Sequence, residues 1–158
     1  MQLHRGTSLL LNVGHALDHM FLLIFATAVA AVAADFGFAG WEDLMPYSAG
    51  AFLMFGLGSV PAGRLGDLWG RRAMMVIFFV GIGAASLLAS LAQGPWTMAA
   101  ALALIGLFAS IYHPVGIPML VQKAEKPGFT IGVNGVAGNM GIAIAAGGSA
   151  SASASTSR

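Results

Sequence analysis

Charge is scarce in this sequence, and the scarcity decides its class. Only 8% of the residues are charged and 58% are hydrophobic, whereas soluble domains carry about 25% charged residues. The mean hydropathy of +0.83 reflects the same imbalance. We therefore expect a membrane protein, in which most of the 158 residues are needed for spans of about 20 residues each.

Cysteine is absent altogether. Without it the chain has no disulfide framework, no thiolate nucleophile and no cysteine-based metal site. Serines are present, but none lies in a Gly-x-Ser-x-Gly turn, so the sequence does not indicate a serine hydrolase. The net charge of +1 gives no indication of a nucleic-acid partner. We expect no enzyme activity, no cofactor, no metal ion and no bound nucleic acid.

Long apolar segments take up most of the chain and predict helices that cross a lipid bilayer. Because a helix rises about 1.5 Å per residue, roughly 20 apolar residues are enough for one crossing. Five segments qualify, at about residues 8–34, 46–63, 73–93, 97–121 and 130–146. We expect an all-α membrane protein with about five transmembrane helices, formed by residues 1–146.

The basic residues indicate the orientation of these spans. If successive spans alternate in direction, the N-terminus and the second and fourth connections lie on the same side of the bilayer. Those three places contain every Lys and Arg before the C-terminal residue: Arg5, Arg64, Arg71, Arg72, Lys123 and Lys126. The positive-inside rule then places the N-terminus in the cytoplasm. We expect a multi-pass protein of the cell (inner) membrane.

The composition changes after Ala146, where two glycines are followed by alternating serine and alanine. Such alternation provides no continuous apolar surface for lipid and no side chains that could pack into a core. We expect residues 147–158 to form a disordered tail. We interpret this tail as the mark of truncation or a frameshift in a longer protein.

Polar side chains inside the spans are costly, which makes each of them a candidate functional site. By the helical rise, His15 lies roughly 10 Å from the cytoplasmic start of the first span and His113 roughly 12 Å from the end of the fourth, so the two share a depth. Asp18 and Asn139 both lie roughly 15 Å deep, near the midplane. The candidate pathway for substrate and protons comprises His15, Asp18, His19, His113 and Asn139.

Proton binding and release is the chemistry that these residue types favour. The unperturbed pKa of histidine, about 6.5, allows it to change charge near physiological pH. We interpret these side chains as lining a water-accessible cavity, and this arrangement predicts a proton-coupled secondary transporter of small molecules. The alternative is that they only hydrogen-bond between helices, an interaction worth about 0.6 kcal/mol. We prefer that second interpretation for His19, Asn12 and Asn134.

Glycine recurs at every third position of the fifth span, at Gly132, Gly135, Gly138 and Gly141. Small residues allow helices to approach closely, so this pattern predicts a packing face. It does not predict a phosphate-binding loop, because no Gly-Lys-Ser/Thr sequence follows.

A charged segment between the second and third spans carries a recognisable pattern. It follows the scheme Gly-x-x-x-Asp-x-x-Gly-Arg-Arg from Gly63 to Arg72, and we expect it to form a short charged turn. The pattern resembles the loop motif of the major facilitator superfamily of secondary transporters. The resemblance implies that Asp67 and Arg71 contact neighbouring helix ends and hold a cytoplasmic gate shut. The expected gating motif consists of Gly63, Arg64, Asp67, Gly70, Arg71 and Arg72.

Two further segments resemble one branch of that superfamily. Residues 112–116 (Tyr-His-Pro-Val-Gly) and the glycine-rich residues 135–141 look most like the fosmidomycin-resistance efflux proteins. The resemblance implies efflux by alternating access, with the first and fourth helices lining a central cavity. It also implies about twelve spans, so five would be an incomplete N-terminal half that requires the missing half or a partner chain.

Two other functions remain open from the sequence. The chain could be a truncated membrane remnant that transports nothing, or a subunit that acts only with a partner chain. More remotely, His15 and His113 could serve as the paired axial ligands of a haem.

Overall fold

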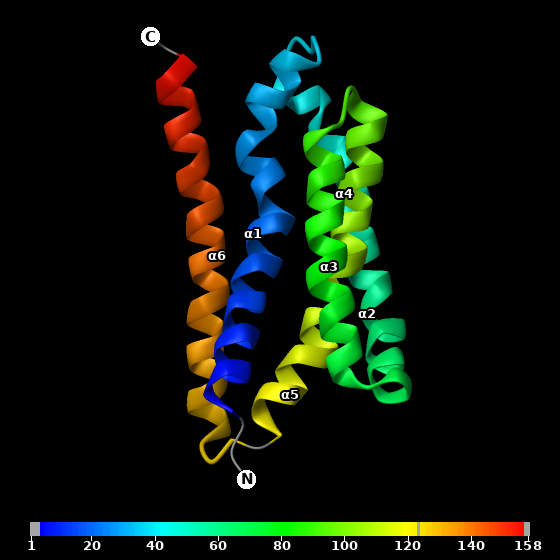
Figure 1. Ribbon diagram of the computed structural model, residues 1–158. Helices are drawn as coiled ribbons and strands as arrows, with labels where there is room; N and C mark the ends of the chain where they lie inside the picture. Colours follow the sequence, from blue (N-terminus) through cyan, green and yellow to red (C-terminus); the bar gives the residue numbers. More distant parts are fainter. Residues whose placement is uncertain (1–3, 123, 157–158) are drawn as a thin grey trace.

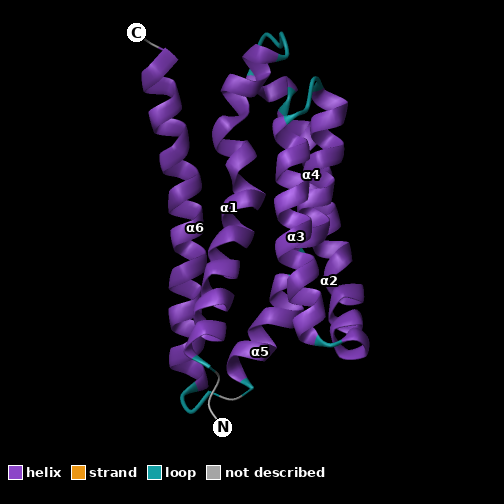
Figure 2. Cartoon of the chain, in the orientation of Figure 1, coloured by secondary structure: helices purple, strands orange, loops and turns teal. Residues whose placement is uncertain are grey.

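The protein is a bundle of helices that run alternately up and down (Figure 1). The computed structural model describes residues 4–122 and 124–156. Within these residues the chain forms helices joined by short loops, with no strand (Figure 2). The all-α fold expected from the composition is confirmed.

Helix α1, Arg5–Asp35, forms the first span. At its start the His4 side chain accepts a hydrogen bond from the Gly6 backbone N–H at 3.2 Å. At its end Gly37 adopts a φ of +75°, which a residue without a Cβ reaches at no steric cost. This lets the Phe38 N–H bond back to the Ala33 carbonyl at 2.9 Å and close the helix.

Two short 3-10 turns, Trp41–Asp43 and Met45–Ser48, connect α1 to α2. Helix α2 spans Ala49–Trp69 and α3 spans Arg71–Ser90. Pro61 lies inside α2, and the helix continues through it. Proline is tolerated in membrane helices where neighbouring groups satisfy the freed carbonyl.

The fourth span is built from three consecutive pieces. Helix α4, Pro95–Ala109, leads into a π-helical turn, η3 (Tyr112–Gly116), and then into the short helix α5, Ile117–Val121. After a loop, α6 runs over Pro127–Thr156. Lys123, one of the residues used to infer orientation, lies outside the described residues.

The helices pack in two groups. Helix α6 lies along α1, and α4 packs against both α2 and α3 (Figure 1). Large apolar side chains, including Phe78 and Ile82 of α3, are almost fully buried between the groups. The fourth span contacts both groups, because η3 touches α1 as well as α2 and α3. This places the residues of η3 at the centre of the bundle.

Among the described residues, four helical segments are long and apolar enough to cross a membrane: α1, α3, the fourth span (Pro95–Val121) and the first part of α6 (Pro127–Gly148). Helix α2 is not among them, since it includes the charged residues Arg64 and Asp67. It nevertheless packs beside α3, which runs in the opposite direction, and beside α4, which runs in the same direction (Figure 1). The arrangement is that of a partial bundle with five long helical segments.

The alternating serine and alanine segment, for which a disordered tail was expected, lies largely within the bounds of α6. Helix α6 continues through it to Thr156. Alanine has the highest intrinsic helix propensity and serine is only moderately unfavourable, so the segment can extend a helix that is already formed. The last two residues of the sequence lie outside the described residues.

Candidate functional site

A cluster of histidine and aspartate side chains lies between α1 and η3. His15, Asp18 and His19 come from α1 at spacings of three and four residues, which places them along one side of the helix. His113 comes from η3. One nitrogen or oxygen atom from each of the four residues lies within 4.8 Å of the others. We call this group the His–Asp cluster.

The shared depth of His15 and His113, expected from the helical rise, is confirmed. Their ring centroids are 5.1 Å apart, in an edge-to-face arrangement. His19, for which a purely structural role was preferred, also belongs to the group. Its Nε2 atom is 3.0 Å from Nε2 of His15.

Asp18 is the most deeply buried member of the cluster, with none of its surface exposed. Its Oδ2 atom is 3.3 Å from Nε2 of His113, an ion-pair distance if the imidazole is protonated. That contact lacks the geometry of a hydrogen bond, and neither carboxylate oxygen accepts one from any described residue. A buried carboxylate in this state is stabilised by a nearby positive charge.

The orientation of His15 is fixed by its other ring nitrogen. Nδ1 of His15 lies 2.8 Å from the backbone carbonyl oxygen of Asn134 on α6. A carbonyl oxygen can only accept, so Nδ1 carries the proton that it donates. The lone pair of a neutral His15 therefore sits on Nε2, which faces His19.

Behind His15 lies a hydrogen-bonded network from three helical elements. The ring of Tyr112 stacks on His15 with a centroid distance of 4.9 Å, and its hydroxyl donates to the Leu11 carbonyl at 2.7 Å. The Asn134 amide donates to the Tyr112 hydroxyl at 2.9 Å and to Asn12 Oδ1 at 3.0 Å. The interhelical role preferred for Asn12 and Asn134 agrees with these bonds. Tyr112 was not singled out from the sequence, although its position next to His113 is a usable signal.

The π-helical turn explains how neighbouring residues can both reach this site. Tyr112 and His113 are consecutive, yet both rings contact His15. A π turn holds more residues than an α turn, so each residue advances through a smaller angle. Such turns occur frequently at functional sites.

Two glycines of α6 give the cluster its space. A Cβ atom on Gly138 would lie 2.8 Å from Cε1 of His15 and 3.0 Å from Cδ2 of His19, and one on Gly141 would collide with the backbone of Ala16. The predicted packing face is thus confirmed for these two positions. At Gly132 and Gly135 an added Cβ would meet no atom of the described residues within 4 Å.

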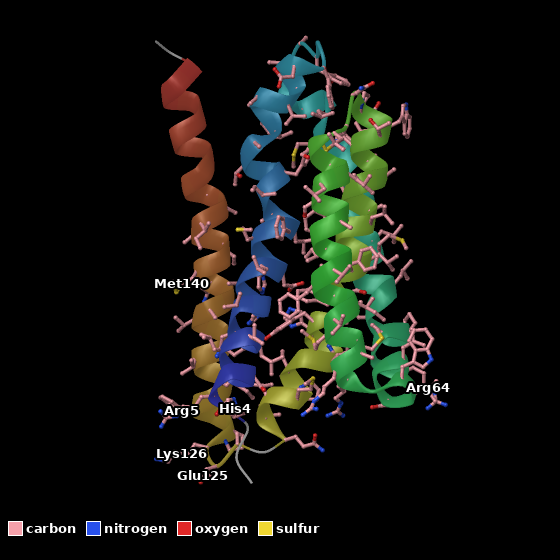
Figure 3. All side chains as sticks on the ribbon, viewed as in Figure 1. His4, Arg5, Arg64, Glu125, Lys126 and Met140 are labelled. Carbon is pink, nitrogen blue, oxygen red and sulfur yellow. The ribbon has the colours of Figure 1, made fainter. Side chains whose placement is uncertain are left out.

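Asn139 is not part of the cluster. It lies on α6 with its side chain exposed, next to Met140, which points away from α1 (Figure 3). The helical rise gave its depth but not its face. Five residues separate it from Asn134, which corresponds to a rotation of about 140° around the helix.

The charged motif differs from the expected turn. Gly63, Arg64 and Asp67 form the last turns of α2, and Arg71 and Arg72 begin α3. Only Gly70 is non-helical. It adopts a φ of +91°, which glycine allows, and thereby reverses the chain within a single residue.

The charged contacts of this motif are local and exposed. Arg71 lies 3.7 Å from Asp67, whose side chain is 65% exposed, and it donates to the side chain of Gln122, at the end of α5, at 3.3 Å. Arg71 therefore reaches a neighbouring helix end. Arg64 lies at the same end of the bundle as Arg5 and Lys126 (Figure 3).

Comparisons with known proteins identify a family and two relatives. The family model described as Major Facilitator Superfamily matches residues 11–157. The chain is 36% identical over 99 residues to the probable actinorhodin transporter of Streptomyces coelicolor, an alignment that covers 63% of this chain and 17% of the relative. It is 35% identical over 95 residues to the puromycin resistance protein pur8 of Streptomyces alboniger, covering 58% and 19% respectively. The aligned region thus spans less than a fifth of either relative. No solved structure matches. The fosmidomycin-resistance branch is not among these findings and stays a resemblance.

Proposed function

Because the chain belongs to the major facilitator superfamily, we propose that it is part of a proton-coupled secondary transporter that exports small organic molecules by alternating access. The observation that carries this proposal is the buried His–Asp cluster, in which Asp18 has no exposed surface. Ionisable groups at membrane depth mark proton and substrate pathways. The names of the two relatives, one a transporter and one a resistance protein, support export of an organic compound.

The geometry supports proton handling by Asp18 and His113 as a pair whose net charge depends on one proton. A proton on His113 gives an imidazolium 3.3 Å from the Asp18 carboxylate, so the buried pair is neutral overall. If the pair loses that proton, the carboxylate is left without compensation. A conformation that exposes the pair to water on one side then favours loss of the proton, and closure favours its return.

His19 and His113 provide the access route to the cluster. Both are only half-buried, whereas His15 and Asp18 are enclosed. The cluster is therefore partly exposed on the side of His19 and His113, where water or substrate would reach the imidazoles. In secondary transporters the site lies near the midplane, between helical repeats that rock around it.

The ends of α2, α3 and α5 supply the gate in this proposal. Arg71 links Asp67 to Gln122, so it connects three helical elements at the end of the bundle that carries the basic residues. An exposed ion pair is worth about 0.2–1 kcal/mol. Contacts of this size can be broken and re-formed within a transport cycle.

We place the chain in the cell (inner) membrane with its N-terminus in the cytoplasm. Arg5, Arg64 and Lys126 lie at one end of the bundle (Figure 3), whereas the acidic turn Trp41–Asp43 lies at the other. This separation is the one that the positive-inside rule describes.

The haem alternative does not suit the geometry. His19 Nε2 approaches His15 Nε2 to 3.0 Å, so an imidazole occupies the place that an iron and its porphyrin would need. We do not propose electron transfer.

Proton movement driven by substrate is the test. Inverted membrane vesicles containing the protein as expressed from its own gene are energised and then given puromycin, and release of the proton gradient is followed with a pH-sensitive dye. The wild-type protein should release the gradient, and Asp18→Asn should abolish the release. Asp35→Asn is the matched control, because it removes a carboxylate from the exposed end of the same helix and should behave as wild type. Equal activity of Asp18→Asn and wild type would overturn the role of the cluster.

The gate is tested in the same vesicles with Asp67→Asn. This substitution removes the charge that pairs with Arg71 and should slow gradient release several-fold while insertion into the membrane stays normal. Gradient release at the wild-type rate in Asp67→Asn would contradict the proposed gate. It would not affect the proposal for the His–Asp cluster.

A further inference from the structure

The His–Asp cluster also has the composition and spacing of a metal site. We propose that His15, Asp18, His19 and His113 bind one divalent transition-metal cation of the Zn²⁺ class. The inference goes beyond the proposed transport function and does not rest on it, because metal binding can be measured in the absence of transport.

Three of the donors come from one helix at a spacing that suits chelation. His15 and His19 are four residues apart, which places two imidazoles on the same face, and Asp18 lies between them at the margin of that face. Pairs of histidines at this spacing bind zinc from a single helix. His113 adds a fourth donor from η3. Three nitrogens and one oxygen make the four-coordinate set that Zn²⁺ prefers.

The distances are close to those of a tetrahedral site. Zinc bonds of about 2.0–2.2 Å place neighbouring donor atoms about 3.3 Å apart. The His15–His19 nitrogen pair is at 3.0 Å, and His113 Nε2 is 3.3 Å from Asp18 Oδ2. The widest pair of donor atoms is within 4.8 Å, so bringing all four around one ion requires that pair to close by about 1.5 Å.

The hydrogen bonding of His15 matches that of a histidine that binds a metal. Its Nδ1–H is held by the Asn134 carbonyl, which leaves the Nε2 lone pair directed at the centre of the cluster. Metal-binding histidines usually donate their other ring N–H to a carbonyl or carboxylate in this way. In the metal-free cluster His19 must supply the proton between the two Nε2 atoms, and a bound cation would replace that proton.

Asp18 provides a second, independent observation. Its oxygens are fully buried and accept no hydrogen bond within the described part of the chain, and its carboxylate faces the imidazole of His113. A divalent cation would satisfy this carboxylate directly. The four donors carry one negative charge when the histidines are neutral, so the complex would carry a single positive charge.

The donor set also selects the class of metal. Imidazole suits zinc, copper, nickel and iron, whereas Mg²⁺ and Ca²⁺ prefer sites made of oxygen atoms. The half-buried His19 and His113 leave a route by which the ion can enter.

Metal binding to the purified chain tests this inference. The chain carries a tag without histidine, is stripped with a chelator, and is loaded with Zn²⁺ or Co²⁺ in detergent. We expect about one Zn²⁺ retained per chain after gel filtration, and intense visible absorption from four-coordinate Co²⁺. X-ray absorption of the Zn²⁺ form should show nitrogen and oxygen ligands only.

Variants separate a built site from adventitious binding. His113→Ala and Asp18→Asn should each weaken Zn²⁺ affinity by more than about 100-fold, beyond the 10- to 100-fold typical when a group that merely holds a ligand is lost. His4→Ala is the matched control, since His4 is the other histidine of the chain and caps the start of α1. It should bind as wild type. Circular dichroism and gel filtration establish that each variant is folded.

Three results would overturn the inference: no metal retained by the folded wild-type chain, a loss of binding with His4→Ala equal to that with His113→Ala, or unchanged binding in both folded cluster variants. None of them would alter the expected effect of Asp18→Asn on proton release. Conversely, a chain that binds Zn²⁺ but moves no protons would leave the metal site standing without the transport proposal.

Discussion

Among the individual residues, Asp18 places the strongest demand on its surroundings. It is a carboxylate with no exposed surface and no hydrogen bond from a described residue. Within the described part of the chain, its ionisable neighbours are the histidines of the His–Asp cluster. The positions of those imidazoles, and whatever holds them, therefore control the chemistry of the site.

Gly138 leaves the space that the imidazoles of His15 and His19 occupy, and Gly138→Ala tests whether that space is needed. The new Cβ would lie 2.8–3.0 Å from atoms of His15 and His19, so both rings must shift. We expect loss of substrate-driven proton release in vesicles, with little change in helical content. Gly135→Ala is the control, because its Cβ would meet nothing within 4 Å in the described structure.

The two alanine variants should also differ in stability. Replacing a helical glycine by alanine stabilises a helix by about 1 kcal/mol, and Gly135→Ala should show that gain in thermal unfolding. At Gly138 the crowding of the two imidazole rings should cancel this gain in stability. An equal gain at both positions would mean that the rings move away freely, which would contradict the packing argument.

At the scale of the helical element, the position of a side chain along the helix axis was predictable from the sequence. The side of the helix on which it lies was only partly predictable. The rise per residue brought His15 and His113 together, because depth depends only on counting along a helix. It did not indicate that Asn139, expected at the depth of Asp18, lies on the exposed side of α6. It also gave no role to Tyr112, since the stacking of Tyr112 on His15 depends on a π-helical turn that no sequence pattern signalled.

The charged motif shows the same limit. Its residues were assigned to a short turn between the second and third spans. Helix α2 nevertheless continues to Trp69, where the end of the helix extends towards water. A single glycine, Gly70, is enough for the reversal, and the sequence does not reveal how short a turn the neighbouring helices allow.

The contact between α1 and α6 can be tested with introduced cysteines, because the chain has none of its own. Thr27 donates to the Ala145 carbonyl at 3.1 Å, so Thr27→Cys with Ala145→Cys should form a disulfide under mild oxidation. Adding Gly141→Ala should reduce the yield several-fold, because its Cβ would collide with the Ala16 backbone, which cannot move aside as a side chain can.

Gly147→Ala is the control for this experiment. A Cβ at Gly147 would be free of atoms within 4 Å in the described residues, so the cross-linking yield should match that of the cysteine pair alone. An unchanged yield with Gly141→Ala would show that α1 and α6 do not depend on this close approach.

On the scale of the whole molecule, the charge distribution predicts orientation in the membrane. Arg5, Arg64 and Lys126 lie at one end of the bundle (Figure 3), and Glu42 lies in the turn at the other end. The sequence was sufficient for this inference, since the positive-inside rule needs only the order of spans and loops.

Labelling in intact cells checks that orientation. We expect Glu42→Cys to react with a membrane-impermeant maleimide from outside, and Lys126→Cys to react only after permeabilisation. The opposite pattern would place the N-terminus outside the cytoplasm. Labelling of both positions from outside would contradict the bundle topology itself.

The π-helical turn has a genetic consequence. Because Tyr112–Gly116 holds one residue more than an α-helical turn would, loss of a single codon there would restore regular winding. Regular winding would shift the residues on one side of the deletion by one position along the helix, so Tyr112 and His113 would lose the register in which both rings contact His15. The contact between α1 and the fourth span therefore depends on a length difference of one amino acid. A single insertion is enough to produce such a difference.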